Sequence, residues 1–182
     1  VPELNMEIPA KKGFSVIATA NTRDKGVNEM SAALKRRFNI VVLPTPASLE
    51  TEIDIVKTRV EQLSGGMELN ASLPESDVVE KVCTIFRELR NGETCDKSQK
   101  LKTTTGVLST AEAISLLCGS MALAGSFGNG KVSDEDLAAG LAGAVIKEED
   151  KDVTAWKEYL ENVMKKRGSK WSGLYNACRE LL

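Results

Sequence analysis

The stretch Phe14-Ser15-Val16-Ile17-Ala18-Thr19 and the later stretch Phe38-Asn39-Ile40-Val41-Val42-Leu43 are both continuous apolar, partly β-branched runs. A strand with one solvent face would alternate, so both runs predict strands buried on two faces. A short helix over residues 31–37, capped by Ser31, is expected between them. Strand, helix and strand at this spacing predict a right-handed crossover in a parallel sheet. Two strands do not make a stable sheet alone, so its other strands are expected outside this chain.

From residue 47 onward, apolar residues recur at helical spacing. Serines with capping potential precede four of the expected helices: Ser48, Ser72, Ser109 and Ser133. Glu75 and Glu112 follow Ser72 and Ser109 by three residues, which predicts a capping box at each. Glu50 and Glu52 fall in the first turn after Ser48, where the helix dipole favours carboxylates. Two more helices are expected over residues 153–166 and 172–182. The predicted fold is therefore an α/β remnant in residues 1–46 followed by an all-α bundle of roughly five or six helices in residues 47–182. The chain as a whole is expected to be mostly α.

Composition excludes several kinds of chemistry. The chain has 182 residues, a net charge of -2 and no histidine, which rules out Ser-His-Asp and Cys-His catalysis. Four cysteines without a CxxC pair argue against zinc, and Cys83, Cys118 and Cys178 are expected in the core. These cysteines suit a reducing compartment, so a cytoplasmic location is expected. The charge gives no general attraction to nucleic acid or an anionic membrane, and neither is an expected partner.

Asn21 and the pair Arg36 and Arg37 are the candidate catalytic residues. An amide just after a buried strand lies at the ligand-binding edge of a parallel sheet, where it can orient water against a γ-phosphate. The alternative is that Asn21 only opens a turn. Arginines at the end of a short helix can reach a phosphate on a neighbouring subunit. The alternative is a solvated basic helix end that the helix dipole favours.

Together, Ala18-Thr19-Ala20-Asn21 and Ala33-Leu34-Lys35-Arg36-Arg37-Phe38 resemble the AAA+ ATPases, and within them the MoxR-like group. The resemblance implies that Asn21 is the sensor-1 residue. It implies that Arg37 is the arginine finger, with Arg36 a close second. It is specific over residues 13–43 and architectural over residues 44–182, where this family has a helical lid.

The resemblance also implies ATP and Mg²⁺ as cofactors of the full-length protein. The family's phosphate-binding loop and its Mg²⁺-holding acidic strand would lie upstream of Val1, so this chain alone is expected to bind neither ligand and to be inactive. The family's sensor-2 arginine would fall in Ser109-Thr110-Ala111-Glu112, where alanine takes its place. Thr110 and a lysine of the preceding loop, Lys102 or Lys100, are the candidate nucleotide-binding residues. Otherwise such loop lysines are simply solvated.

Two other features have simpler interpretations. The stretch Gly125-Ser126-Phe127-Gly128-Asn129-Gly130-Lys131 matches a GxxxxGK phosphate loop, but Val132 follows where Ser or Thr is needed. We expect it to be a loop between helices. The carboxylates of Glu148, Glu149, Asp150 and Asp152 are expected to form a solvated helix start. On the helix that follows, Trp156 and Tyr159 are expected in the core.

The sequence thus predicts the C-terminal portion of a MoxR-like AAA+ ATPase. The resemblance implies a ring of identical subunits, typically a hexamer, that couples ATP hydrolysis to chaperone-like remodelling of a protein client. It also implies a possible partner with a von Willebrand factor A domain. The alternative is a non-enzymatic helical protein-interaction module. A GxxxxGK loop followed by Ser or Thr, encoded upstream of Val1, would distinguish the two hypotheses.

Overall fold

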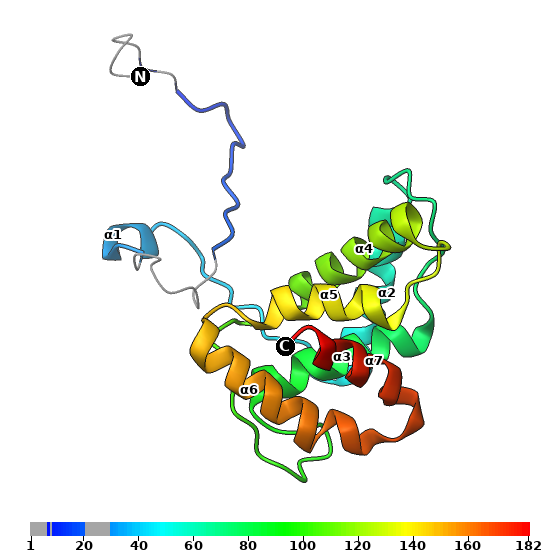
Figure 1. Ribbon diagram of the computed structural model, residues 1–182. Coiled ribbons are helices and arrows are strands. Elements are labelled where there is room, and N and C mark those ends of the chain that lie inside the picture. The colour runs from blue at the N-terminus through cyan, green and yellow to red at the C-terminus, as the bar shows by residue number, and fades with distance from the viewer. Residues whose placement is uncertain (1–6, 8, 21–29) are drawn as a thin grey trace. The chain divides into compact units, whose positions relative to one another are not determined.

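The computed structural model describes residue 7, residues 9–20 and residues 30–182 (Figure 1). The chain divides into a small unit, Val1–Val42, and a larger helical unit, Leu43–Leu182. This division falls close to the boundary that the sequence places after Pro46. The candidate site described below is built from the larger unit.

In the small unit, the short helix expected between the two apolar runs is present as α1 (Ala32–Lys35). Ser31 caps it as expected, because the Leu34 amide donates to Ser31 Oγ at 3.3 Å. The backbone then leaves the helix through Arg36, and the Arg37 amide still donates to the Leu34 carbonyl at 2.9 Å. Both candidate finger arginines therefore follow directly after the last turn of α1.

The structure does not show the two expected strands, and so it does not show the α/β remnant. Among the described residues, 14–19 and 38–43 form no strand, and the only β-bridge joins Glu93 and Lys100. Ile17 is 93% exposed and Leu43 is 86% exposed. A strand depends on ladder hydrogen bonds and on packing against both faces, and neither run has such a partner in the described part of the chain. The described structure is mostly helical.

The larger unit is a bundle, as expected, and its helices are α2 (Leu49–Ser64), α3 (Ser76–Asn91), α4 (Thr110–Phe127), α5 (Asp134–Val145), α6 (Glu149–Asn162) and α7 (Ser169–Glu180), with a 3₁₀ turn η2 (Met164–Arg167) before the last. Ser48, Ser109 and Ser133 cap α2, α4 and α5 as expected. The expected capping box at residues 72–75 is wrong. Glu75 precedes α3 without a side-chain cap, and Ser72 Oγ instead donates to the Gly130 carbonyl at 3.1 Å.

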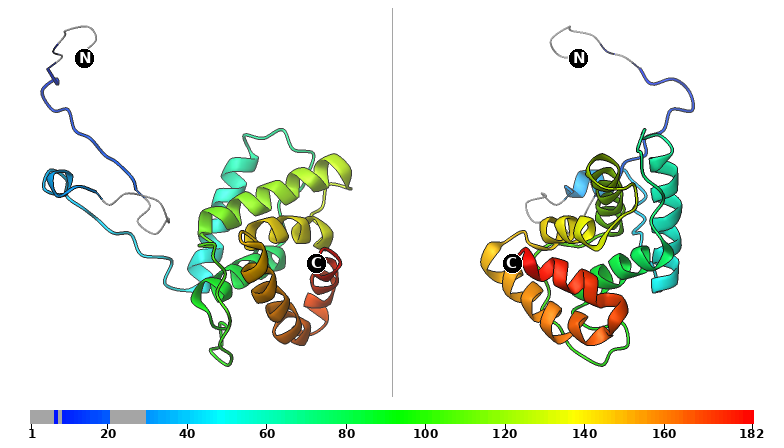
Figure 2. Two further views of the ribbon diagram at one scale, coloured as in Figure 1. Left: turned by 60° about the vertical axis from the view of Figure 1, so that its left-hand side comes forward. Right: turned by 45° about the vertical axis from the view of Figure 1, so that its right-hand side comes forward.

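The core lies between α4 and the helices around it. Helix α4 packs against α2, α3 and α5, while α5 also packs against α7 (Figures 1 and 2). Trp156 and Tyr159 are buried as expected, and their rings stack with centroids 5.7 Å apart. Cys83, Cys118 and Cys178 are also buried, and burial raises the pKa of the Cys83 and Cys178 thiols to about 12. These thiols are therefore core side chains rather than nucleophiles.

Helix α4 is, among the described residues, the one helix long and apolar enough to cross a membrane by length and composition. Its buried side chains include Leu117 and Met121, which belong to the core shared with the neighbouring helices. Packing against three helices explains its apolar character as that of the central helix of a bundle.

A buried carboxylate on α3 ties the C-terminal helices to the rest of the bundle. Glu88 is fully buried, and Tyr159 Oη on α6 donates to its Oε2 at 2.7 Å. Its Oε1 accepts from the Cys95 amide at 2.8 Å and pairs with Arg167 of η2. Burial, and then the charge of Glu88, raise the pKa of Tyr159 well above its usual value. Tyr159 therefore stays protonated and acts as a donor.

The expectation that residues 148–152 form a solvated run is wrong for Asp152. Glu148 and Asp150 are exposed, but Asp152 is fully buried. It accepts from the Lys147 and Glu148 amides at 2.8 and 2.7 Å, and from the amide and hydroxyl of Thr105, each at 2.7 Å. Asp152 therefore fastens the loop that follows α3 to the start of α6.

Substitution of Asp152 by alanine should destabilise the protein. Burial opposes ionisation of Asp152, but the hydrogen bonds from Glu148, Thr105 and Lys147 outweigh it and lower its pKa from 3.8 to about 2. That shift corresponds to about 2 kcal/mol of stability. Because the folded-state pKa is the lower one, this contribution is present above about pH 4 and is lost as the pH falls towards 2.

Urea unfolding at several pH values measures this effect. Asp152→Ala should lower the free energy of unfolding at pH 7, and its difference from the wild type should shrink below pH 4. The exposed Asp150 on the same helix offers the matched control Asp150→Ala, which should change stability little. Equal losses in the two variants, or a loss independent of pH, would contradict the role assigned to Asp152.

Candidate functional site at the start of α4

The turn that leads into α4 has an unusual backbone. Leu108 has a φ of 46°, in the left-handed region, and its side chain is fully buried. A residue with a Cβ pays roughly 1–2 kcal/mol for that conformation. Directly after it, Ser109 and Glu112 form the expected capping box, in which the Ser109 amide donates to Glu112 Oε2 at 2.7 Å. Strained backbone at a helix start is a reason to look for function there.

The strained turn is held by an arginine from α3. Arg90 Nη1 donates to the Leu108 carbonyl at 2.8 Å. Its Nη2 donates to Glu52 Oε2 on α2, also at 2.8 Å. A planar guanidinium fixes both acceptors relative to each other, because its donors have a rigid fork geometry. The position of the turn is therefore determined by α2 and α3 as well as by its own residues.

Glu52 lies at the centre of a cluster that it forms with Arg87, Arg90 and Thr110, here called the Glu52 cluster. Its side chain is buried, and it accepts from Arg90, from Arg87 Nη1 at 3.3 Å and from Thr110 Oγ1 at 3.0 Å. One carboxylate is thus shared by two guanidinium groups beside the N-terminus of α4, and a second carboxylate, that of Glu112, lies in the first turn of that helix.

Arg87 extends the cluster to the segment that enters the bundle. Its Nη1 donates to the Pro46 carbonyl at 3.1 Å and its Nη2 to the Ala47 carbonyl at 2.7 Å. Helix α2 begins directly after this segment, at Leu49. The linker Pro46–Ala47 and the turn Leu108–Thr110 are therefore joined through three side chains: Glu52, Arg87 and Arg90.

The two candidate nucleotide-binding residues, Thr110 and Lys102, each contact a different carboxylate. Thr110 is the first residue of α4, and its hydroxyl is taken by Glu52. Lys102 is exposed, and its Nζ pairs with Glu158 of α6 at 2.6 Å. Lys100, the other lysine considered, pairs with Glu93 at 2.8 Å. Neither lysine takes part in the Glu52 cluster.

Arg36 and Arg37 belong to the small unit. Both are exposed, and neither guanidinium has a hydrogen-bond or ion-pair partner among the described residues. Asn21, the candidate sensor-1 residue, lies outside the described residues. In the described part of the chain, no group of three or more His, Cys, Asp or Glu side chains could hold a metal ion.

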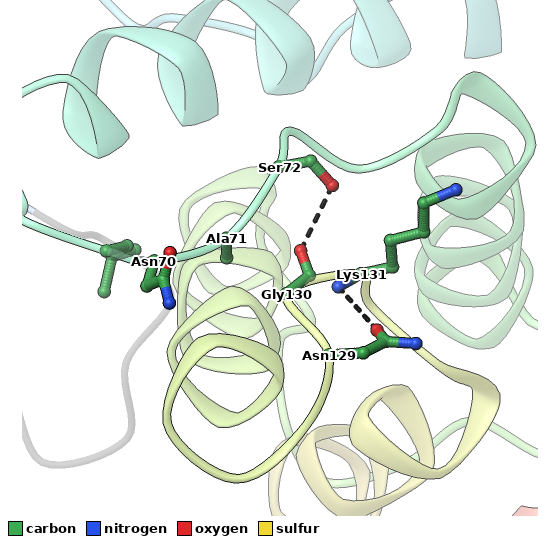
Figure 3. Close-up of a pocket in the computed structure, with 7 residues that line it drawn as sticks. Asn70, Ala71, Ser72, Asn129, Gly130 and Lys131 are labelled. Atoms are coloured by element: carbon green, nitrogen blue, oxygen red, sulfur yellow. Dashed lines mark hydrogen bonds between the residues drawn. The ribbon is translucent and has the colours of Figure 1, made fainter.

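The glycine-rich stretch that matches GxxxxGK is confirmed as a loop between helices. It starts within α4, which ends at Phe127, and α5 begins after it at Asp134 with three acidic residues in its first turn. Figure 3 shows the surface pocket that this loop forms with residues 69–72, and the Lys131 side chain extends away from the loop. The Lys131 amide donates to Asn129 Oδ1 at 3.0 Å, and the Ser72 amide donates to the Gly130 carbonyl at 2.8 Å.

Its glycines serve packing. A Cβ on Gly125 would lie 3.1 Å from the Asn70 backbone, and one on Gly130 would lie 2.9 Å from the Asn70 carbonyl oxygen. Gly130 also has a φ of 83°. Gly125 and Gly130 are therefore explained by the close approach of the Asn70 backbone, and Gly130 also by its left-handed conformation, without a phosphate.

Gly130→Ala should lower the free energy of unfolding by about 1–2 kcal/mol, because alanine is strained at positive φ and its Cβ meets a backbone oxygen. Gly119→Ala is the matched control, since Gly119 lies within α4 with nothing within 4 Å of an added Cβ. There alanine should be neutral or stabilising by up to about 1 kcal/mol. Thermal or urea unfolding compares them, and equal effects of the two changes would contradict the packing role.

Sequence reasoning missed Glu52, Arg87 and Arg90. Glu52 was interpreted only as a first-turn carboxylate that the helix dipole favours. The available signal was its spacing, because it lies four residues before Val56 and eight before Val60, on the buried face of α2. The two arginines lie three residues apart on α3, so the spacing also places them on one face.

Comparison with known proteins assigns the chain to the AAA+ ATPases. A family model for the AAA domain (dynein-related subfamily) matches residues 1–38. The model of the YehL-like AAA+ ATPase C-terminal domain matches residues 50–181, so the chain belongs to this family. The AAA+ family expected from the sequence is confirmed, whereas these matches do not test the MoxR-like subgroup.

One curated relative is the uncharacterized protein YehL of Escherichia coli (strain K12). It is 35% identical over 185 residues, an alignment that covers 99% of this chain and 50% of YehL. The chain thus spans about half the length of this relative. No solved structure matches the chain.

Proposed function

We propose that the chain is the C-terminal portion of an AAA+ ATPase and that its helical unit is the lid over the nucleotide. The observation that supports this most strongly is the strained turn at Leu108, held by Arg90 at the N-terminus of α4. That helix start lies within the segment that matches the YehL-like AAA+ ATPase C-terminal domain. In the full-length protein, ATP and Mg²⁺ would bind mainly to residues upstream of this chain.

The lid would contribute to nucleotide binding without a sensor-2 arginine. The position expected for that arginine is Ala111, whose side chain has no charge and is exposed. The N-terminus of α4, and the Arg90 guanidinium that donates to the Leu108 carbonyl just before it, offer an alternative attraction for a phosphate. Thr110 would act through the backbone and through its contact with Glu52, since its hydroxyl is already occupied. Lys102 would need to leave Glu158 to reach a nucleotide.

The small unit would supply the residues that act on the γ-phosphate. Arg37 is exposed and without a partner among the described residues, as an arginine finger for a neighbouring subunit needs to be. Arg36 shares these properties and remains the second candidate. Asn21 would be the sensor-1 residue. Residues 14–19 and 38–43 would pair with strands of the upstream core, which would cover the side chains of Ile17 and Leu43.

The finer assignment follows the sequence resemblance. The full-length protein would be a MoxR-like, cytoplasmic ATPase that forms a ring, typically a hexamer, and remodels a protein client. A protein with a von Willebrand factor A domain would be its partner. The support for the ring is that Arg36 and Arg37 are exposed and without a partner among the described residues, as arginines that act on a neighbouring subunit's nucleotide would be.

Arg37→Ala in the full-length protein should reduce ATP turnover by about 10³-fold while leaving nucleotide affinity nearly unchanged, because the finger stabilises charge that develops in the transition state. The steady-state kcat and the KM for ATP measure this. Lys11→Ala, which removes another exposed cation of the small unit, is the matched control and should leave kcat unchanged. Arg36→Ala tests the second candidate.

A mixing experiment tests whether the finger acts between subunits. Arg37→Ala subunits are combined with subunits that keep Arg37 but cannot bind ATP. Activity should exceed that of either variant alone, because one subunit's finger faces its neighbour's nucleotide. Mixed rings without such recovery would refute action between subunits. A full-length protein that lacks ATPase activity altogether would favour the alternative, a non-enzymatic helical interaction module.

The chain by itself should neither hydrolyse ATP nor bind it tightly. Millimolar ATP with Mg²⁺ should leave its melting temperature unchanged, because a ligand stabilises only a state to which it binds. Differential scanning fluorimetry measures this, with a salt-matched sample as the control. An upward shift that is specific to ATP would show that residues of this chain suffice to hold the nucleotide.

A further inference from the structure

We infer that Glu52, Arg87 and Arg90 are positioning residues that couple the linker Pro46–Ala47 to the turn Leu108–Thr110. Their effect on ATP turnover rests on the proposed function, in which this turn faces the nucleotide. The coupling itself rests only on contacts within the helical unit. These three side chains therefore form one device, which we call the Glu52 relay.

The first step of the argument is that the relay is continuous. Arg87 holds the carbonyls of Pro46 and Ala47 at 3.1 and 2.7 Å. It contacts Glu52 at 3.3 Å, and Glu52 contacts Thr110 Oγ1 at 3.0 Å. Arg90 joins Glu52 to the Leu108 carbonyl through two contacts of 2.8 Å. Every link between the linker and the turn is thus a direct hydrogen bond or ion pair.

The second step is that the relay is stiff. The Glu52 side chain is 1% exposed, and those of Arg90 and Arg87 are 9% and 18% exposed. Breaking a buried pair leaves an uncompensated charge away from water, which costs far more than losing a surface ion pair. If the turn moves, the three side chains therefore transmit the movement to the linker more readily than they rearrange to accommodate it.

The third step concerns the strain at Leu108. Its left-handed backbone is disfavoured on its own, so the turn depends on Arg90 to stay in place. A ligand at the N-terminus of α4 that shifts this turn would act on Arg90, then on Glu52 and Arg87. The linker they hold begins nine residues after Arg37 in the sequence. The relay is thus a route by which a shift of the turn at the N-terminus of α4 reaches the linker that leads into α2.

Hydrogen exchange measured by mass spectrometry tests the coupling in this chain without any ATPase activity. The variant is Arg87→Met, which removes the linker contacts but leaves Glu52 paired with Arg90 and Thr110. Arg87 does not touch the turn directly, so an isolated role predicts faster exchange only in peptides covering residues 43–51. The relay predicts that exchange also rises by about tenfold in peptides covering residues 105–113. A rise confined to the linker would overturn the inference.

Kinetics of the full-length protein test the consequence. Arg87→Met should lower kcat by about five- to tenfold and change the KM for ATP less than twofold, because the relay positions groups rather than binding ATP. Arg59→Met is the matched control, since Arg59 is an exposed arginine of α2 whose guanidinium donates to Gln62 Oε1 and takes no part in the Glu52 relay. It should leave exchange and kcat unchanged. An unchanged kcat in Arg87→Met would overturn the positioning role.

A conservative variant separates positioning from charge balance. Arg87→Lys keeps a positive charge for Glu52, but one ammonium cannot reproduce the rigid fork that holds two carbonyls and the carboxylate. Relative to Arg87→Met, the melting temperature of Arg87→Lys should therefore return to the wild-type value. The kcat, and the hydrogen exchange of residues 43–51 and 105–113, should not return to wild-type values. Full recovery of all three would show that Glu52 needs only a counter-charge, and the inference would fall. If the wild-type protein has no ATPase activity, the proposed function fails, and the exchange experiment still decides the coupling.

Discussion

The buried carboxylate of Glu52 is the constraint on which the start of α4 depends. A carboxylate away from water has to be compensated, and here the compensation comes from two arginines of one neighbouring helix and a hydroxyl of another. Other N–H groups of the same arginines donate to backbone carbonyls of two loops. A single charge placed on the inner face of α2 thus determines where the chain enters the bundle and where α4 begins.

Because the partners of a buried charge come from distant segments, the sequence predicted the helices better than the polar interior. Ser48, Ser109 and Ser133 act within one turn of chain, so their capping roles can be predicted from local spacing. Glu52 and Asp152 look like ordinary first-turn carboxylates, and only their register with Val56 and with Trp156 places them inside. Which partners they meet there depends on helices distant in sequence, and no local pattern encodes that.

The two apolar runs form no strands in the described structure, and the reason is related. Residues 14–19 and 38–43 have the composition of buried strands, yet a strand is defined by its neighbour, and none lies in the described part of the chain. The helical unit meets its own packing needs and forms as expected. Of the candidate site, the capping box of Ser109 and Glu112 was predictable from local spacing, whereas the contacts of the α3 arginines were not, because their acceptors lie on segments distant in sequence.

The contacts of Glu88 have a consequence for the smallest size at which this helical unit can fold. Its carboxylate is compensated by Tyr159 and Arg167, which belong to the last third of the chain. A protein shortened after α5 would keep the acidic residue and lose both partners, together with buried side chains of α6 such as Trp156 and Leu160. The C-terminal helices are therefore required for the stability of the helical unit. The smallest autonomous version of this domain therefore extends at least through Arg167.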